Sequence, residues 1–159
     1  SPVAHNTLGT ILLKLDLPDL ARAEFERALT LDPRAAYVLN NLCYVALLQG
    51  HSGVAIDTCR KALELEPDLK TARNNLALAH AAAGDFDAAS REFLVTGPSD
   101  TASYNMGISL LATGHFDAAA RAFDHAALLR PSFTDAQTFA AQARTLAARA
   151  ARGTADEQR

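Results

Sequence analysis

The side chains best suited to chemistry in this sequence are two cysteines and five histidines. Cys43 and Cys59 carry thiols, which form disulfides, bind metals or act as nucleophiles. The imidazoles, which could bind metal or transfer protons, belong to His5, His51, His80, His115 and His125. Two cysteines are too few for a disulfide framework or a zinc site, and the histidine and carboxylate spacings match no metal-ligand set. We therefore expect no bound metal ion.

Other catalytic patterns are also missing from the sequence. No glycine-rich phosphate loop occurs, and no serine or cysteine has a nearby base with a group to orient it. His51 and His115 follow Gly50 and Gly114 in matching turn segments, so we interpret both histidines as exposed turn residues. The sequence predicts no catalytic site, no cofactor and no enzyme activity.

The composition favours helices and argues against two classes of protein. The chain has 159 residues, of which 49% are hydrophobic but only 6% aromatic, and alanine and leucine supply most of the apolar content. The net charge of −3 argues against nucleic-acid binding, which normally needs a basic stripe. No uninterrupted run of about 18 apolar residues occurs, so no membrane span is predicted.

An internal repeat organises most of the chain. Ala21, Ala55, Ala89 and Ala119 begin similar segments and lie 34, 34 and 30 residues apart. Turn-like stretches precede these segments (LDLPD, QGHSG, AGDFD and TGHFD), and prolines close three of them, in FERALTLDP, CRKALELEP and FDHAALLRP. A repeat of this length indicates a stack of helix pairs, because one pair cannot bury its own apolar face.

This pattern resembles the tetratricopeptide repeat (TPR) family. The residues that carry the resemblance are Leu8, Gly9, Leu12, Ala21, Phe25, Ala28 and Pro33 in the first repeat, Leu39, Leu42, Cys43, Ala46, Ala55, Cys59, Ala62 and Pro67 in the second, Leu76, Ala77, Ala89 and Phe93 in the third, and Met106, Gly107, Leu110, Ala119, Phe123, Ala126 and Pro131 in the fourth. His5, Arg73 and Ser103 depart from the family pattern, which has a large apolar residue at their position.

The resemblance implies an all-α fold, a right-handed superhelical TPR solenoid of four helix-turn-helix repeats with a C-terminal capping helix. We assign the repeats to residues 2–35, 36–69, 70–99 and 100–133, and the capping helix to residues 134–150. Together they form a single domain over residues 1–150. Residues 151–159 are expected to be a flexible tail.

Physical chemistry accounts for the recurring positions. Small residues lie where helices touch and let the axes approach, and Leu and Phe fill the space between them. Proline stops each second helix, since it cannot continue the hydrogen-bond ladder. Acidic side chains start the second helices, where free N–H groups attract negative charge, as at Asp19, Asp87 and Asp117.

The third repeat is shorter than its neighbours, and its closing segment reads VTGPSD. The missing length is about one helical turn, so the apolar face stays in phase. We expect a shortened second helix over about residues 87–96, ended by the Gly-Pro pair, and a new first helix that begins at Ser99 or Asp100. We also expect a change in superhelix pitch and additional space beside Tyr104.

The family pattern places Cys43 and Cys59 opposite each other on the two helices of the second repeat. The alternatives are a disulfide and a pair of buried free thiols. Packed helix axes lie about 8–10 Å apart, whereas a disulfide needs Cα atoms within about 7 Å. We therefore favour free thiols.

In TPR proteins the first helix of each repeat lines a concave groove, so the resemblance also implies binding residues. Asparagine amides there suit an extended peptide backbone, with helix packing as the alternative role, and exposed apolar residues mark partner sites. The cations of the family's carboxylate clamp are missing, so acidic C-termini are not predicted ligands. The predicted groove residues are Asn6, Tyr37, Asn40, Asn41, Tyr44, Leu48, Asn74, Asn75, Leu78, Tyr104, Asn105 and Ile108.

We therefore expect a non-catalytic scaffold that binds a protein or peptide partner in this groove. The phrases NNLALAHAAAGDFDAA and YNMGISLLATGHFDAAARAF resemble TPR proteins of bacterial envelope machinery, including tight-adherence pilus assembly. That resemblance implies the bacterial cytoplasm, periplasm or cell envelope. Two alternatives remain: self-association into a homo-oligomer through the groove or the first repeat, and service as an accessory domain of a larger enzyme.

Overall fold

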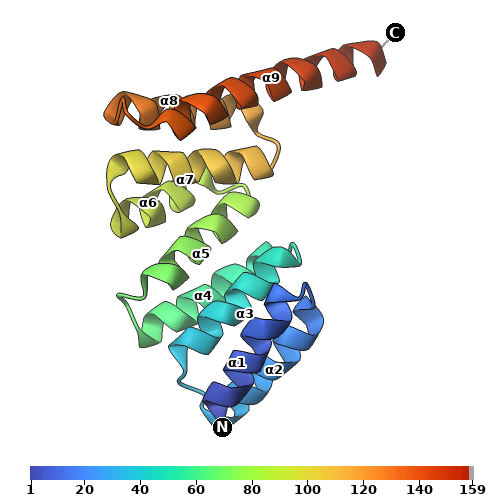
Figure 1. Ribbon diagram of the computed structural model, residues 1–159, viewed down its shortest axis with the longest axis vertical. Helices are drawn as coiled ribbons and strands as arrows, with labels where there is room; N and C mark the ends of the chain where they lie inside the picture. Colours follow the sequence, from blue (N-terminus) through green and yellow to red (C-terminus); the bar gives the residue numbers. More distant parts are fainter. Residues whose placement is uncertain (158–159) are drawn as a thin grey trace. The chain divides into compact units, whose positions relative to one another are not determined.

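The computed structural model describes the backbone of residues 1–157 and the side chains of residues 1–153, and this part of the chain is built from helices without a strand (Figure 1). The helices are α1 (Pro2–Lys14), α2 (Pro18–Leu31), α3 (Ala36–Leu48), α4 (Ser52–Leu65), α5 (Lys70–Ala82), α6 (Phe86–Thr96), α7 (Ser99–Ala112), α8 (Phe116–Leu129) and α9 (Thr134–Glu157). The all-α repeat fold predicted from the sequence is confirmed.

The chain divides into two compact units. The first, Ser1–Asp85, contains α1 to α5, and the second begins at Phe86 and contains α6 to α9. The sequence predicts a single domain over residues 1–150, whereas this boundary falls at the turn between the two helices of the predicted third repeat. Each unit is therefore described by itself.

Glycines in the first helices let the second helices come close. A Cβ atom on Gly9 of α1 would lie 2.5 Å from Cε1 of Phe25 on α2, and one on Gly107 of α7 would lie 2.6 Å from the ring of Phe123 on α8. Both distances are far shorter than a carbon–carbon contact allows. The prediction that small residues lie where paired helices touch is confirmed at both places.

The turns after the first helices share one backbone conformation. Gly50, Gly84 and Gly114 have φ of 74°, 84° and 79°, and Asp16 holds the same position after α1 with φ of 59°. In each turn the next N–H reaches back into the helix, as from His51 to the carbonyl of Ala46 at 2.9 Å. These backbone hydrogen bonds satisfy carbonyl groups at the end of each first helix. They require a residue with φ in the left-handed region, which glycine adopts without steric cost.

The second helices end where the sequence predicts. α2, α4 and α8 stop two residues before the closing prolines, at Leu31, Leu65 and Leu129. Asp19 and Asp117 lie in the first turns of α2 and α8, but neither helix has a side-chain hydrogen bond at its N-cap. Their negative charge lies near the helix N-terminus, where it is favourable, and Oδ1 of Asp19 accepts hydrogen bonds from Arg22 and Gln49.

Two helices have notable lengths. α6 has 11 residues, against 14 in α2, α4 and α8, which confirms the shortened helix predicted for the third repeat. α9 has 24 residues and continues to Glu157, whereas the sequence predicts a capping helix that ends at residue 150 and a flexible tail after it. Alanine, arginine and glutamate favour helix, and one interior glycine, Gly153, costs only about 1 kcal/mol relative to alanine. Residues 158 and 159 lie outside the described part.

Cys43 and Cys59 form a disulfide, so the prediction of free thiols is wrong. Their Cα atoms lie 5.3 Å apart. The prediction compared the distance between helix axes with a limit that applies to Cα atoms. Each Cα lies about 2.3 Å from its own axis, so axes about 8–10 Å apart leave facing Cα atoms only about 3.4–5.4 Å apart.

Candidate peptide-binding surface

Asparagine side chains connect the first helices of unit one. Nδ2 of Asn41 on α3 donates to Oδ1 of Asn6 on α1 at 2.8 Å, and Nδ2 of Asn75 on α5 donates to Oδ1 of Asn40 on α3 at 3.0 Å. Nδ2 of Asn40 also lies 3.4 Å from Oδ1 of Asn41. These four amides form a ladder that holds α1, α3 and α5 together.

The ladder gives these asparagines the packing role that the sequence analysis left as an alternative. Each carboxamide offers two N–H donors and an oxygen with two lone pairs, so the bridges use only part of its capacity. All four side chains are half-buried, which leaves them in contact with the surface. Asn74 differs, because its Oδ1 is buried and has no hydrogen-bond partner among the described residues.

An apolar strip lies beside the ladder on α3. Tyr37, Tyr44 and Leu48 are between 37% and 55% exposed, although all three are large hydrophobic residues. Their spacing of seven and four residues places them on one face of the helix, together with Asn40 and Asn41. We call these five residues the α3 surface. Leu78, on α5, is half-buried.

The remaining predicted groove residues, Tyr104, Asn105 and Ile108, lie on α7 in unit two and are half-buried. The ring of Tyr104 packs against three phenylalanines, with centroid distances of 4.7 Å to Phe133, 5.5 Å to Phe123 and 6.0 Å to Phe139. The side of Tyr104 that faces α8 and α9 is therefore filled. Burial raises the pKa of Tyr104, and the charge of Asp135 acts in the same direction.

Sequence reasoning missed this aromatic cluster, because two of its rings lie outside the repeat pattern. Phe133 precedes α9 and Phe139 lies within it. Arg130 covers the cluster, with its guanidinium carbon 3.9 Å from the centroid of Phe133 and its Nε 2.8 Å from the carboxylate of Asp100. The signal in the sequence was the pair of aromatic residues in a segment otherwise rich in alanine.

The five histidines do not assemble into a site. His5 contacts Glu24, His80 lies 3.7 Å from Asp85, and His115 accepts or donates a hydrogen bond with Thr113. His51 and His115 are exposed at the turns before α4 and α8, as predicted. Within the described residues, no three metal-binding side chains gather closely enough to hold an ion.

Ser103 and His125 are the pair that most resembles a nucleophile with its base. Nδ1 of His125 lies 2.8 Å from Oγ of Ser103, a contact that the sequence pattern does not predict. Ser103 Oγ also donates to the carbonyl of Ser99 at 2.7 Å. A hydroxyl has one proton, so the imidazole is the donor to Ser103 and does not act as its base in this arrangement.

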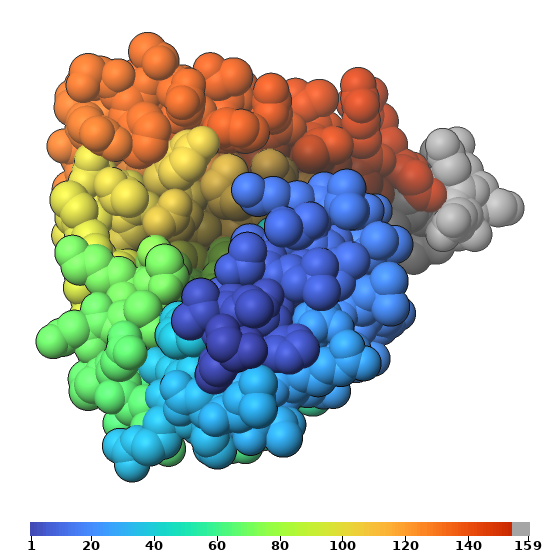
Figure 2. Space-filling model, turned by 60° about the horizontal axis from the view of Figure 1, so that its bottom comes forward, coloured from blue at the N-terminus to red at the C-terminus, as the bar shows by residue number. Residues whose placement is uncertain are grey.

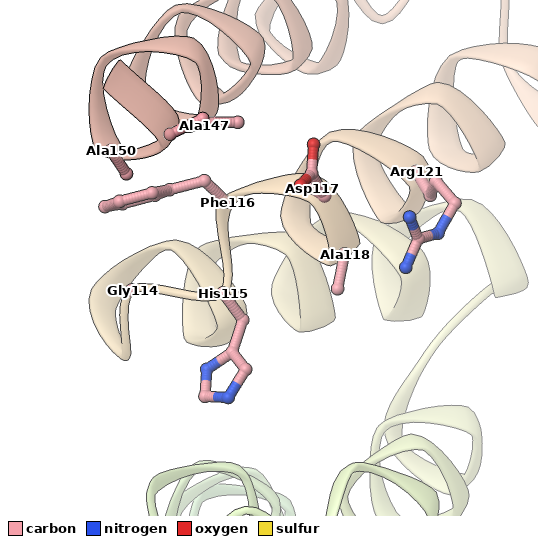
Figure 3. Close-up of a pocket in the computed structure, with 9 residues that line it drawn as sticks. Gly114, His115, Phe116, Asp117, Ala118, Arg121, Ala147 and Ala150 are labelled. Carbon is pink, nitrogen blue, oxygen red and sulfur yellow. The ribbon is translucent and has the colours of Figure 1, made fainter. Parts of the chain in front are cut away.

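A cleft of about 500 Å³ lies between the start of α8 and the second half of α9 (Figure 3). Phe116 lies beside Ala150, whereas the ring of His115 is directed away from α9 (Figure 3). Asp117 and Arg121 also line the cleft but point in different directions (Figure 3). Because these polar groups do not converge on one point, the cleft lacks the arrangement of a small-molecule site.

The charged group with the clearest electrostatic effect is Glu24 on α2. Its Oε2 accepts a hydrogen bond of 2.7 Å from Nδ1 of His5, and its Oε1 accepts one from Nη1 of Arg27. The hydrogen bond from His5 lowers the pKa of Glu24 below its ordinary value of 4.5. Burial opposes this shift, and the charges of Arg27 and His5 support it. His5 thus occupies its unusual repeat position as the partner of a buried carboxylate.

Comparison with known proteins places these helix pairs in a described repeat. A profile of the tetratricopeptide repeat matches residues 6–69, and a second profile of the same repeat matches residues 71–93 and 101–125. No curated protein sequence matches the chain. No helix among the described residues combines the length and apolar character needed to cross a bilayer.

Solved structures share the fold at low sequence identity. A tetratricopeptide repeat protein from Parabacteroides merdae is 19% identical with a TM-score of 0.72, and the match covers 98% of this chain and 62% of that one. PilW, a type IV pilus biogenesis factor, is 21% identical with a TM-score of 0.68, over 92% of this chain and 70% of that one. MamA is 20% identical with a TM-score of 0.66, over 95% and 86%. These likenesses concern the fold alone.

Proposed function

Because the chain belongs to the tetratricopeptide repeat family, we propose that it is a non-catalytic scaffold that binds an extended peptide segment of a partner protein on the α3 surface. The observation that carries the proposal is the exposed apolar strip of Tyr37, Tyr44 and Leu48 beside asparagines with unused hydrogen-bonding capacity. Tyrosine and leucine side chains anchor apolar residues of a peptide, and amides pair with its backbone.

The chemistry of the surface indicates the kind of segment that fits it. The α3 surface contains no charged side chain, and the family's carboxylate clamp lacks its cations. An uncharged, apolar-rich extended segment therefore suits this surface better than an acidic C-terminus, whose carboxylates would lose hydration without gaining ionic partners. For unit two taken by itself, we propose Asn105 and Ile108 on α7 as separate contact residues for a partner.

The test compares two double variants in binding to a library of displayed peptides. Tyr44→Ala with Leu78→Ala should weaken the selected peptides by about 30- to 700-fold, since each truncated anchor typically costs about 1–2 kcal/mol and the pair therefore about 2–4 kcal/mol. The control, Leu94→Ala with Leu128→Ala, removes exposed apolar residues outside the predicted groove and should leave affinity unchanged. Circular dichroism should show intact helices in both. Equal affinity of the wild type and the first variant would reject the assignment.

We also propose that the scaffold serves the assembly of a bacterial envelope or pilus complex. The phrases shared with TPR proteins of envelope machinery support this role, and PilW, a pilus biogenesis factor, has the same fold. Fractionation of the source cells, followed by cross-linking and mass spectrometry, tests it. Recovery of the protein in the cytosol, cross-linked only to cytosolic partners, would contradict an envelope role.

A second candidate function, self-association, is favoured by the exposed face of the first repeat. Ile11 on α1 is 48% exposed, whereas Val45, its counterpart on α3, is 1% exposed and packs in the core with α2. Leu8 shows the same contrast with the partly buried Leu42. Figure 2 shows α1 and α2 at the surface of the N-terminal end. A second copy of the chain that covers this face of α1 would bury Leu8 and Ile11, just as α2 buries the equivalent positions of α3.

Sedimentation velocity over a concentration series tests this second candidate. The wild type should form a larger species as concentration rises, and Leu8→Glu with Ile11→Glu should remain monomeric, because burying carboxylates in the interface is costly. The matched control, Val54→Glu with Leu128→Glu, places the same charges on other exposed apolar positions and should associate like the wild type. A wild type that stays monomeric at every concentration removes self-association.

A further inference from the structure

The two helices of a repeat make the same contact in the first and fourth repeats, whereas the second repeat has a disulfide at that place. In the first and fourth repeats, glycine on the first helix receives the ring of a phenylalanine 16 residues later, as Gly9 receives Phe25 and Gly107 receives Phe123. Cys43 and Cys59 have the same separation of 16 residues and the same positions on α3 and α4. The disulfide therefore takes the place of a ring packed against backbone.

The surroundings of the disulfide show why the contact matters. Both cysteines are 0% exposed and belong to the core cluster of Ala46, Ala55, Leu76 and Ala79. Three of the four other buried members are alanines, and the larger side chains of Leu47, Ile56 and Leu63 pack against the cluster from partly buried positions. With the disulfide formed, the two sulfur atoms connect the helices covalently where the other repeats use a bulky ring.

We propose that Cys43 and Cys59 are a substrate pair for thiol–disulfide exchange and that the second repeat attains full stability only after oxidation, which assigns the domain to an oxidising compartment. The two thiols lose two protons and two electrons, and one S–S bond forms between Sγ atoms. The acceptor is the disulfide of a protein or small-molecule oxidant, whose S–S bond breaks as it becomes a dithiol. Such bonds persist in the bacterial periplasm and are rare in the cytosol.

The reduced pair cannot replace the disulfide by packing alone. Two unbonded sulfur atoms must lie farther apart than two bonded ones, so α3 and α4 separate or the thiols turn aside. The unfolded chain also regains the freedom that a cross-link over 16 residues removes. Once formed, the bond is shielded from solvent, so a reductant reaches it only when the repeat opens. It therefore acts as a structural cross-link and not as a switch.

The glycine–phenylalanine pair of the first and fourth repeats provides a variant of the second repeat that tests the proposal. Thermal unfolding of the full chain is measured after refolding with and without a reductant. The wild type should lose about 5–10 °C in midpoint when reduced, and Cys43→Ala with Cys59→Ala should show a similarly low midpoint under both conditions. Cys43→Gly with Cys59→Phe, which copies the first and fourth repeats, should regain most of the loss and ignore the reductant.

Two results would overturn the proposal. One is an alanine pair as stable as the oxidised wild type. The other is detection of two free thiols in protein taken from its own cells under acid quench and alkylated, since each free thiol adds the mass of one label. The expected result is an unlabelled protein that gains two labels only after reduction in denaturant. Expression in a reducing cytosol should give the doubly labelled, less stable form, and export to an oxidising compartment should give the unlabelled one.

Discussion

Nδ2 of Asn41 donates a hydrogen bond of 2.8 Å to Oδ1 of Asn6, which lies 35 residues earlier in the chain. Asn75 and Asn40 repeat this relationship with the same separation at 3.0 Å. The equal separation shows that the bond recurs with the helix pairs, so each amide fixes one first helix against the next. The asparagines of the surface proposed for peptide binding therefore also hold neighbouring helices of the scaffold together.

The ladder predicts opposite effects for two similar substitutions. Asn41→Leu leaves Oδ1 of Asn6 without its donor and should lower the free energy of unfolding by about 1–2 kcal/mol. Asn74→Leu removes a buried oxygen that has no partner and should be neutral or stabilising by up to about 1 kcal/mol. Urea unfolding monitored by circular dichroism measures both. Equal destabilisation by the two variants would show that the ladder bond contributes nothing specific.

The contact between Gly9 and Phe25 predicts a strong effect from a single methyl group. Gly9→Ala places a Cβ 2.5 Å from the ring, so α1 and α2 must separate, at a cost of about 1–3 kcal/mol. Gly53→Ala is the control, because its Cβ meets no atom within 4 Å in α4. That change should stabilise by about 0.5–1 kcal/mol through helix propensity. Thermal midpoints that move in the same direction for both variants would contradict the packing explanation.

Glu24 predicts a pH dependence of stability on the acid side. Its pKa is lowered in the folded protein, so its contribution is complete above the ordinary value of 4.5 and is lost as pH falls through the folded value. Between about pH 5 and pH 3, the wild type should therefore lose more thermal stability than Glu24→Gln, which cannot titrate. Glu26→Gln, on the exposed side of α2, should follow the wild type. Parallel curves for all three proteins would show that the His5 contact has no such effect.

The fold could be predicted from the sequence because its signals are local and repeated. Small residues, phenylalanines and closing prolines recur at fixed spacings, and the ends of α2, α4 and α8 follow from them. The shortened α6 was visible as a missing turn before a Gly-Pro pair. Helix ends of this kind depend on a few neighbouring residues, so a sequence pattern is sufficient to locate them.

The roles of individual side chains were harder to predict, because they depend on distances between helices. The disulfide was missed since facing Cα atoms lie closer than the helix axes that carry them. Tyr104 matched a groove position, yet its ring packs against Phe133 and Phe139, which the repeat pattern does not include. The asparagines could be assigned to binding or to packing on composition alone, and only the bond distances identified the ladder.

The sequence by itself determined the repeat, its helix pairs and its family, because apolar periodicity and backbone-breaking residues act within a few positions of one another. Only the tertiary structure decided which side chains meet across helices: Asn41 with Asn6, Cys43 with Cys59, and Tyr104 with its phenylalanines. The physical reason is that such contacts depend on helix separation and rotation, which are set by the combined packing of many residues and not by any single spacing in the chain.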